Sequence, residues 1–271
     1  MILMGNKKLK AFILVLLAAV FLLLLSPVIS LCLPDKLRHH IYQRLIFNAI
    51  VEKETKGCAT DEEKAYALFN YVARNEIARG VPHKCKPLDS LIFREAYCDF
   101  QARTLNLLLA VAGIPSRYAM LLDENGISQH TINEVLLDNK WRLFDTTNNY
   151  IFRDNNGNLL SLNELFNNPQ NVYTAEKIAL KASRKDFITL YEKILSARKE
   201  PHRSTPCIYQ SHIFDAISDI YFRIFKYGFL NFYQDVYLLI NKAHAHPEDL
   251  RLFYNARGYH LAYRFSLASQ V

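Results

Sequence analysis

The stretch from residue 98 to residue 145 constrains most strongly what this chain of 271 residues can fold into. It begins with apolar residues that recur at helical spacing, namely Ala102, Leu105, Leu109 and Ala112. Gly113 and Pro115 follow. Because glycine often ends a helix and proline cannot continue one, the sequence predicts a buried helix from Cys98 to Ala112.

Three short segments after this helix have the length and flanking turns of β-strands. They are residues 116–122, 130–137 and 141–145, separated by the turn sequences Asp123-Glu124-Asn125-Gly126 and Asp138-Asn139-Lys140. A further strand pair is expected around residues 154–157, and Ser161 to Glu164 have the pattern of a helix N-terminus. Strands joined by tight turns pair antiparallel. We therefore predict an α+β domain whose buried helix packs on an antiparallel sheet.

Two helices are expected before this region and a separate helical region after it. Residues 35–53 have amphipathic helical spacing, and Thr60-Asp61-Glu62-Glu63 is a capping box that opens a second helix. Residues 174–199 form a charged helical pattern, Pro201 and Pro206 flank an expected linker, and further helices are expected after residue 208. The predicted organisation is an N-terminal segment over residues 1–34, a domain over 35–168 and a helical region over 169–271.

An apolar run from Ala11 to Leu33 follows Lys7, Lys8 and Lys10. As a helix it would extend about 35 Å, enough to cross a hydrocarbon core of about 30 Å. The basic flank favours a cytoplasmic N-terminus. We therefore expect a single-pass anchor in the cytoplasmic (inner) membrane, with the domain outside the cytoplasm. A cleaved signal peptide is the alternative, with Val28-Ile29-Ser30 as a cleavage site and a secreted or periplasmic product.

Charge and cysteine content exclude several classes of function. A formal net charge of +7, spread along the chain, does not indicate nucleic-acid binding. The five cysteines contain no C-x-x-C pair, and the histidine groups at 202–212 and 244–246 lack a clear tetrahedral ligand set. We therefore expect no metal and no cofactor. Cys58 and Cys85 flank the second helix, and whether they pair is left open.

Cys98, His130 and Asp145 are the candidate catalytic residues. Cys98 lies at the start of the predicted buried helix, where the helix dipole and free N–H groups favour a thiolate. His130 begins one predicted strand and Asp145 ends the neighbouring one. Adjacent strand ends can bring the two side chains together, and a carboxylate then orients the imidazole. Singly, each residue has an ordinary structural explanation, so it is the combination in this order that indicates a nucleophile, its base and an orienting group.

Residues 96–147 resemble the transglutaminase-like superfamily, which has a papain-like cysteine fold. The resemblance is carried by Cys98 with its leucine-rich helix, Gly113-Ile114-Pro115-Ser116-Arg117, His130 with Glu134-Val135, and Trp141 with Asp145. It implies that Cys98 is the nucleophile, His130 its base and Asp145 the orienting group. Three positions depart from the family pattern: Ala96 stands where glycine is usual, Ile132 where an aromatic residue is common, and Thr146 where proline is common.

The expected chemistry is attack of the Cys98 thiolate on an amide or acyl carbon of a peptide, protein or amide substrate. Hydrolysis is preferred over transfer to an amine, as in the broad bacterial branch that the chain resembles. A second hypothesis is a catalytically inactive transglutaminase-like module for binding or assembly at the membrane, which Ala96 would permit. A third is an acyltransferase similar to the arylamine acetyltransferases, which share the order of the three residues.

Overall fold

The structure is a computed structural model of the chain. It describes residues 9–18, 20–21, 35–75, 87–93, 96–174, 176–177 and 184–206. The helices predicted after residue 208 lie outside this part of the chain.

The N-terminal half of the domain is helical. The helices are α2 (Asp35–Glu54), α3 (Asp61–Asn75), α4 (Pro87–Phe93) and α5 (Cys98–Val111). The predicted capping box opens α3: the Thr60 hydroxyl accepts from Glu63 N, and the Glu63 carboxylate accepts from Thr60 N, both at 3.2 Å. The helices α2, α3 and α5 begin within one residue of their expected positions, whereas the sequence did not indicate α4.

The C-terminal end of α5 has the geometry that its sequence indicated. Gly113 has a φ of 80°, which an L-residue with a side chain rarely adopts. Gly113 N donates to Ala110 O at 3.1 Å and Ile114 N donates to Leu109 O at 2.9 Å, the two bonds of a Schellman motif. The chain therefore reverses directly from the helix into the first strand.

A six-stranded antiparallel sheet follows, in the order β5-β4-β3-β2-β1-β6. The strands are β1 (Ser116–Leu122), β2 (Ser128–Leu137), β3 (Lys140–Asp145), β4 (Tyr150–Ile151), β5 (Glu176–Lys177) and β6 (His202–Arg203). Between the later strands lie α6 (Leu162–Asn167), the 3₁₀ helix η1 (Pro169–Thr174) and α7 (Arg184–Ala197). Around residues 154–157 the expected strand pair is reduced to a single bridge between Arg153 and Leu159.

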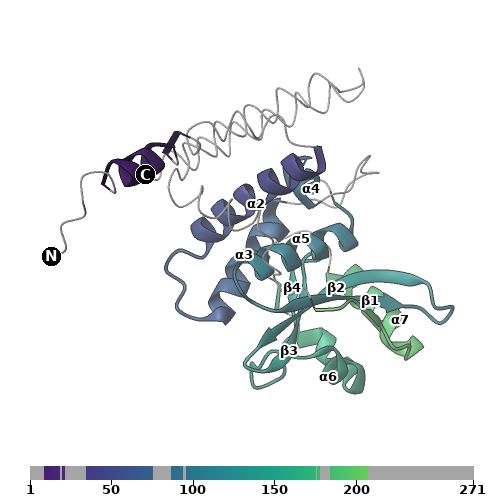
Figure 1. Ribbon diagram of the computed structural model, residues 1–271. Helices are drawn as coiled ribbons and strands as arrows, with labels where there is room; N and C mark the ends of the chain where they lie inside the picture. Colours follow the sequence, from purple (N-terminus) through teal and green to yellow (C-terminus); the bar gives the residue numbers. More distant parts are fainter. Residues whose placement is uncertain are drawn as a thin grey trace.

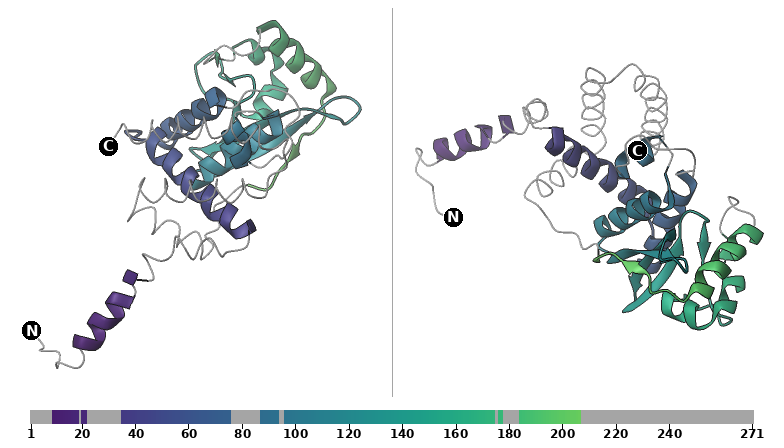
Figure 2. Two further views of the ribbon diagram at one scale, coloured as in Figure 1. Left: turned by 90° about the horizontal axis from the view of Figure 1, so that it is seen from above. Right: turned by 90° about the vertical axis from the view of Figure 1, so that its right-hand side faces the viewer.

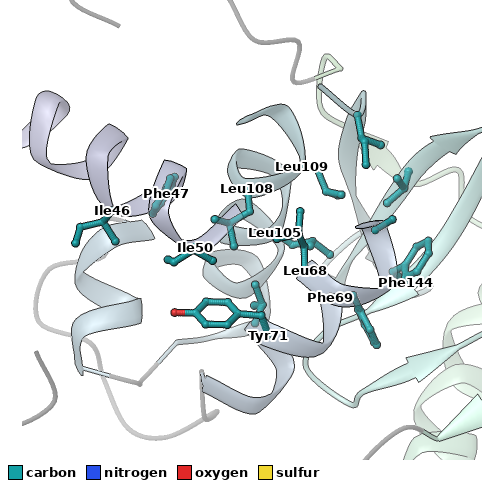
Figure 3. Packing of buried hydrophobic residues seen from close by; sticks show 14 of the residues in the cluster. Ile46, Phe47, Ile50, Leu68, Phe69, Tyr71, Leu105, Leu108, Leu109 and Phe144 are labelled. Atoms are coloured by element: carbon teal, nitrogen blue, oxygen red, sulfur yellow. The ribbon is translucent and has the colours of Figure 1, made fainter. Parts of the chain in front are cut away.

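Helices cover both faces of the sheet. Figure 1 shows α2, α3 and α5 on one side of the strands and α6 and α7 on the other, and the views in Figure 2 agree. On the first side, Phe144 packs with residues of these helices, many of which are labelled in Figure 3. On the second side, Ile132 and Leu143 pack with Phe187 and Tyr191 of α7. Successive side chains of a strand point to opposite faces of the sheet. Successive residues of β2 and β3 therefore face the helices on opposite sides.

The segment predicted as a linker is instead an edge strand. Residues of β6 pair with Ala119 and Met120 of β1. The buried carboxylate of Glu134 accepts from Arg117 Nε at 2.8 Å and from Arg203 Nε at 3.0 Å. The linker prediction was wrong because proline spacing does not reveal this long-range pairing. Residues after 168 therefore contribute α7, β5 and β6 to the same sheet and core as the preceding residues.

The predicted membrane segment, residues 11–33, lies only partly within the described residues. Residues 9–18 and 20–21 are helical, and residues 22–34 lie outside the description. Among the described helices, none combines the length and the apolar character that crossing a bilayer requires.

Candidate functional site

Cys98 is the first residue of α5 and is half-buried. The preceding residue, Tyr97, is extended and makes no side-chain capping bond to the helix. The N-terminal end of the helix therefore presents its dipole and first-turn N–H groups next to the sulfur. Ala96, the departure from the family's glycine, is fully buried, and its carbonyl accepts from Gln101 Nε2 at 3.3 Å. The structure thus accommodates the methyl group of Ala96 inside the core.

His130 lies on β2 with a side chain that is 4% exposed. Its Nε2 is 2.9 Å from Asp145 Oδ2. The ring also hydrogen-bonds with Cys98, and the backbone N–H of Thr131 donates to the same sulfur. Since Nε2 faces the carboxylate, Nδ1 is the nitrogen left for the thiol. One histidine thus joins the sulfur to the carboxylate.

Asp145 ends β3 and is completely buried. Its Oδ2 accepts from three side chains: His130 Nε2, Asn148 Nδ2 at 2.8 Å and the Tyr191 hydroxyl at 2.9 Å. Its Oδ1 accepts from Asn148 N at 3.0 Å. Charge-assisted hydrogen bonds of this kind compensate a carboxylate for the loss of water. Asp145 is therefore held in one orientation, with Oδ2 directed at the imidazole.

A polar link fixes the helix that carries Cys98 to the strand that carries His130. Asn133, fully buried on β2, donates through Nδ2 to Ala102 O at 2.7 Å and to Asn106 Oδ1 at 2.8 Å, both on α5. The thiol and the imidazole sit on separate elements, so their distance depends on how those elements are joined. Asn133 supplies a directional contact between the two that apolar packing alone would not provide.

The electrostatics of the three groups favour a thiolate and an imidazolium. Burial raises the pKa of Cys98, but its hydrogen bond to His130 and the charge of that ring outweigh burial, so the pKa lies below its ordinary value. Burial lowers the pKa of His130, but the charge and hydrogen bond of Asp145, with help from Cys98, raise it to about 10. Burial raises the pKa of Asp145, yet His130 and Asn148 bring it below its ordinary value.

The structure therefore brings together all three residues singled out from the sequence. It also adds Asn148, Tyr191 and the Thr131 N–H, which were not among the residues singled out from the sequence. Asn148 had a weak signal, since a polar residue three positions after an aspartate commonly bonds back to it in a turn. Tyr191 had no such signal, because the sequence around it indicated only a charged helix.

Comparison with known proteins gives a family for the central part of the chain. Residues 48–146 match the model of the transglutaminase-like superfamily. No curated protein matches the chain.

Solved structures similar to the chain share little of its sequence. A "putative protease" from Parabacteroides distasonis is 16% identical over 40% of this chain and 25% of its own, with a TM-score of 0.33. A TGase is 16% identical over 42% of this chain and 34% of its own, with a TM-score of 0.32. A "putative cysteine protease" from Cytophaga hutchinsonii is 16% identical over 64% of this chain and 54% of its own, with a TM-score of 0.34.

This chain thus spans at most about half the length of these structures. Similarity with such low identity and TM-scores gives no information about the reaction of this chain. The family match carries more weight, because it covers the cysteine helix and the strands with the histidine and the aspartate. The similarity to the transglutaminase-like superfamily therefore covers the residues that carry the site.

Proposed function

We propose that this chain is a cysteine enzyme that cleaves an amide or related acyl bond with Cys98 as nucleophile. The observation that carries the proposal is the continuous set of hydrogen bonds from Cys98 through His130 to Asp145. A buried carboxylate on one ring nitrogen and a thiol on the other is the arrangement that turns a thiol into a thiolate at neutral pH.

The reaction proceeds in two halves. The Cys98 sulfur adds to the carbonyl carbon, and the oxyanion lies where the first-turn N–H groups of α5 can donate to it. His130 gives its Nδ1 proton to the leaving amine as the carbon–nitrogen bond breaks, which leaves a thioester on Cys98. A water molecule then loses a proton to His130 and attacks the thioester, and the products are a carboxylic acid and the free thiol. Asp145 stabilises the imidazolium in both halves.

Chemical labelling of Cys98 tests the proposal. At about pH 6 we expect iodoacetamide to label Cys98 about tenfold faster than an unstructured thiol peptide, because a thiolate persists below the usual thiol pKa. Labelling is read residue by residue by mass spectrometry. Cys58, a second half-buried free cysteine, provides a reference within the same chain. If Cys98 reacts no faster than the peptide, the domain is a binding or assembly module and not an enzyme.

We also propose that the N-terminal segment anchors the enzyme in the cytoplasmic membrane, with the catalytic domain outside the cytoplasm. The described part of the segment supports this proposal, because its apolar side chains are largely exposed: Leu14 is 71% exposed, Val15 67% and Phe21 61%. A helix with apolar residues on all sides is otherwise unusual in water. The lysines before it favour a cytoplasmic N-terminus.

Fractionation and protease protection test this placement. The full chain is expected in the membrane fraction, resistant to extraction by carbonate, and accessible to protease from the outer side of the membrane. A variant with Leu14→Lys and Val15→Lys should move to the soluble fraction, since charges at the centre of a span cost about 2.5–3.5 kcal/mol each. Lys53→Leu, a change of similar size on α2, is the control and should stay in the membrane. Full-length chain in the soluble fraction would contradict the proposal.

A further inference from the structure

One contact to the catalytic carboxylate comes from outside the matched segment. Tyr191 lies on α7, beyond residue 146, where the family match ends. Its hydroxyl donates to Asp145 Oδ2 at 2.9 Å, and its ring lies edge-on to His130 with centroids 6.1 Å apart and planes at 82°. α7 therefore reaches the same two side chains that the proposed reaction uses.

The position of Tyr191 is fixed by packing. The residue is fully buried, and its ring contacts Phe152 at a centroid distance of 5.1 Å and Phe187 at 4.7 Å. Phe187 in turn stacks on Tyr150 at 3.7 Å. A ring held by several aromatic neighbours has little rotational freedom, so the hydroxyl stays where it meets the carboxylate.

Tyr191 acts on Asp145 as a permanent donor. Burial and the charge of Asp145 raise the pKa of Tyr191 well above its ordinary value, so the phenol keeps its proton. Asn148 holds Oδ1 through its backbone N–H, whereas Tyr191 and the Asn148 side chain hold Oδ2. Both oxygens of the carboxylate are therefore held, with Oδ2 on His130 Nε2.

We propose that Tyr191 is a positioning residue of the active site, and that α7 is consequently part of the catalytic unit. The inference rests on the proposed function, because it assigns Tyr191 to the proposed reaction. Tyr191 acts through Asp145 and does not touch the substrate. Among the described residues, the titratable groups that face Asp145 are His130 on β2, Tyr191 on α7 and Tyr150 on β4. Cys98 on α5 is reached through His130, with Asp99 beside it.

The test is the pH profile of Cys98 labelling in the Tyr191→Phe variant, which keeps the ring and removes the hydroxyl. Loss of one donor makes the Asp145 carboxylate easier to protonate. As pH falls, the carboxylate therefore loses its charge, and stops stabilising the imidazolium of His130, at a higher pH than in the unmodified protein. The acidic limb of the profile is the pH range in which the labelling rate falls as pH falls. We expect this limb to move to higher pH by about half a unit. Tyr71→Phe, which removes a hydroxyl from a buried tyrosine on α3, is the matched control and should leave the limb in place.

A double-mutant cycle separates positioning from a general loss of structure. Tyr191→Phe should have no further effect on the profile when Asp145 is already replaced by asparagine, because the two residues act in sequence. 3-Fluorotyrosine at position 191 keeps the shape and makes the phenol a stronger donor, so it should move the limb downward even if Tyr191→Phe does not fold.

Three outcomes would overturn the inference alone: an unmoved limb in Tyr191→Phe, an equal shift in Tyr71→Phe, or the same shift in the Asp145→Asn background. Slow labelling of Cys98 in the unmodified protein is a different result. It would overturn the proposed function itself, and the two failures are therefore distinguishable.

Discussion

Replacing His130 by alanine is expected to return Cys98 to an ordinary thiol. The imidazolium is the main group that offsets the burial of the sulfur, so without it burial keeps the proton on Cys98. At about pH 6 the thiolate fraction therefore falls, and although an ordinary thiolate is the stronger nucleophile, labelling should slow about tenfold. Turnover should fall further, by about 10²–10⁴-fold, because the general acid and base is also lost.

Two controls separate this effect from unfolding. His202→Ala removes an exposed histidine on β6, which β1 separates from β2, and should leave Cys98 labelling unchanged. Labelling of Cys58 within the His130→Ala variant should equal that of the unmodified chain, because Cys58 precedes α3 and lies outside the set of hydrogen bonds around Cys98. Cys98 labelling that is as fast without His130 as with it would show that the ring does not activate the thiol.

The elements that carry the site were predictable because their signals are local. α5 combines helical spacing with Gly113 and Pro115, and β1 occupies the predicted residues 116–122. The turn at Asp138-Asn139-Lys140 predicted where β2 ends and β3 begins, and so which residues lie near those strand ends. Cys98, His130 and Asp145 could therefore be placed near element ends from local patterns alone, and the resemblance added their roles.

The remaining contacts depend on tertiary packing that local patterns do not encode. His130 and Asp145 share a sheet face with Ile132 and Leu143, which pack against α7. Only this alternation brings Tyr191 within reach of Asp145, and nothing in the sequence of α7 indicates it. β6 was misread for the same reason. Two residues after a proline carry little strand signal, and their partners Ala119 and Met120 lie far away in the sequence.

The helices α2, α3 and α5 were predicted as elements, but the contacts of Asn133 that join α5 to β2 were not. Asn133 and Phe144 point toward α5, on the opposite face from His130 and Asp145. One face of the sheet thus holds the cysteine helix, and the other holds the tyrosine that steadies the carboxylate. The active site lies where the two meet, which explains why a motif confined to residues 96–147 contains the nucleophile and its base but not every supporting group.

Replacing Asp145 by alanine is expected to change how stability depends on pH. In the unmodified protein, the pKa of His130 is raised to about 10, against an ordinary value of 6.5. A group with a raised pKa contributes fully below its unfolded pKa, so this contribution declines as pH rises from about 6.5 to about 10. The lowered pKa of Asp145 contributes above about pH 4 and is lost as pH falls further. The lowered pKa of Cys98 acts in the opposite sense, because its contribution grows as pH rises toward the ordinary thiol value. The chain with and without Asp145→Ala is therefore compared in a Cys98→Ser background, where stability should be greatest between about pH 4 and about pH 6.5.

The Asp145→Ala variant leaves His130 buried without its anion, and near pH 6 we expect it to lose about 3–5 kcal/mol of unfolding free energy. With the partner gone, burial dominates and the pKa of His130 falls, so the decline in stability above about pH 6.5 should disappear. Urea unfolding at a series of pH values measures both effects.

Asp123→Ala is the control. Asp123 is also buried and hydrogen-bonded, to Asn125 N, Ile127 N and Gln129, but it has no histidine partner among these contacts. It should be destabilised while keeping the alkaline decline. An alkaline decline that survives in Asp145→Ala would mean that the His130–Asp145 pair is not the group that titrates, and the imidazolium would then lack the support on which the proposed chemistry depends.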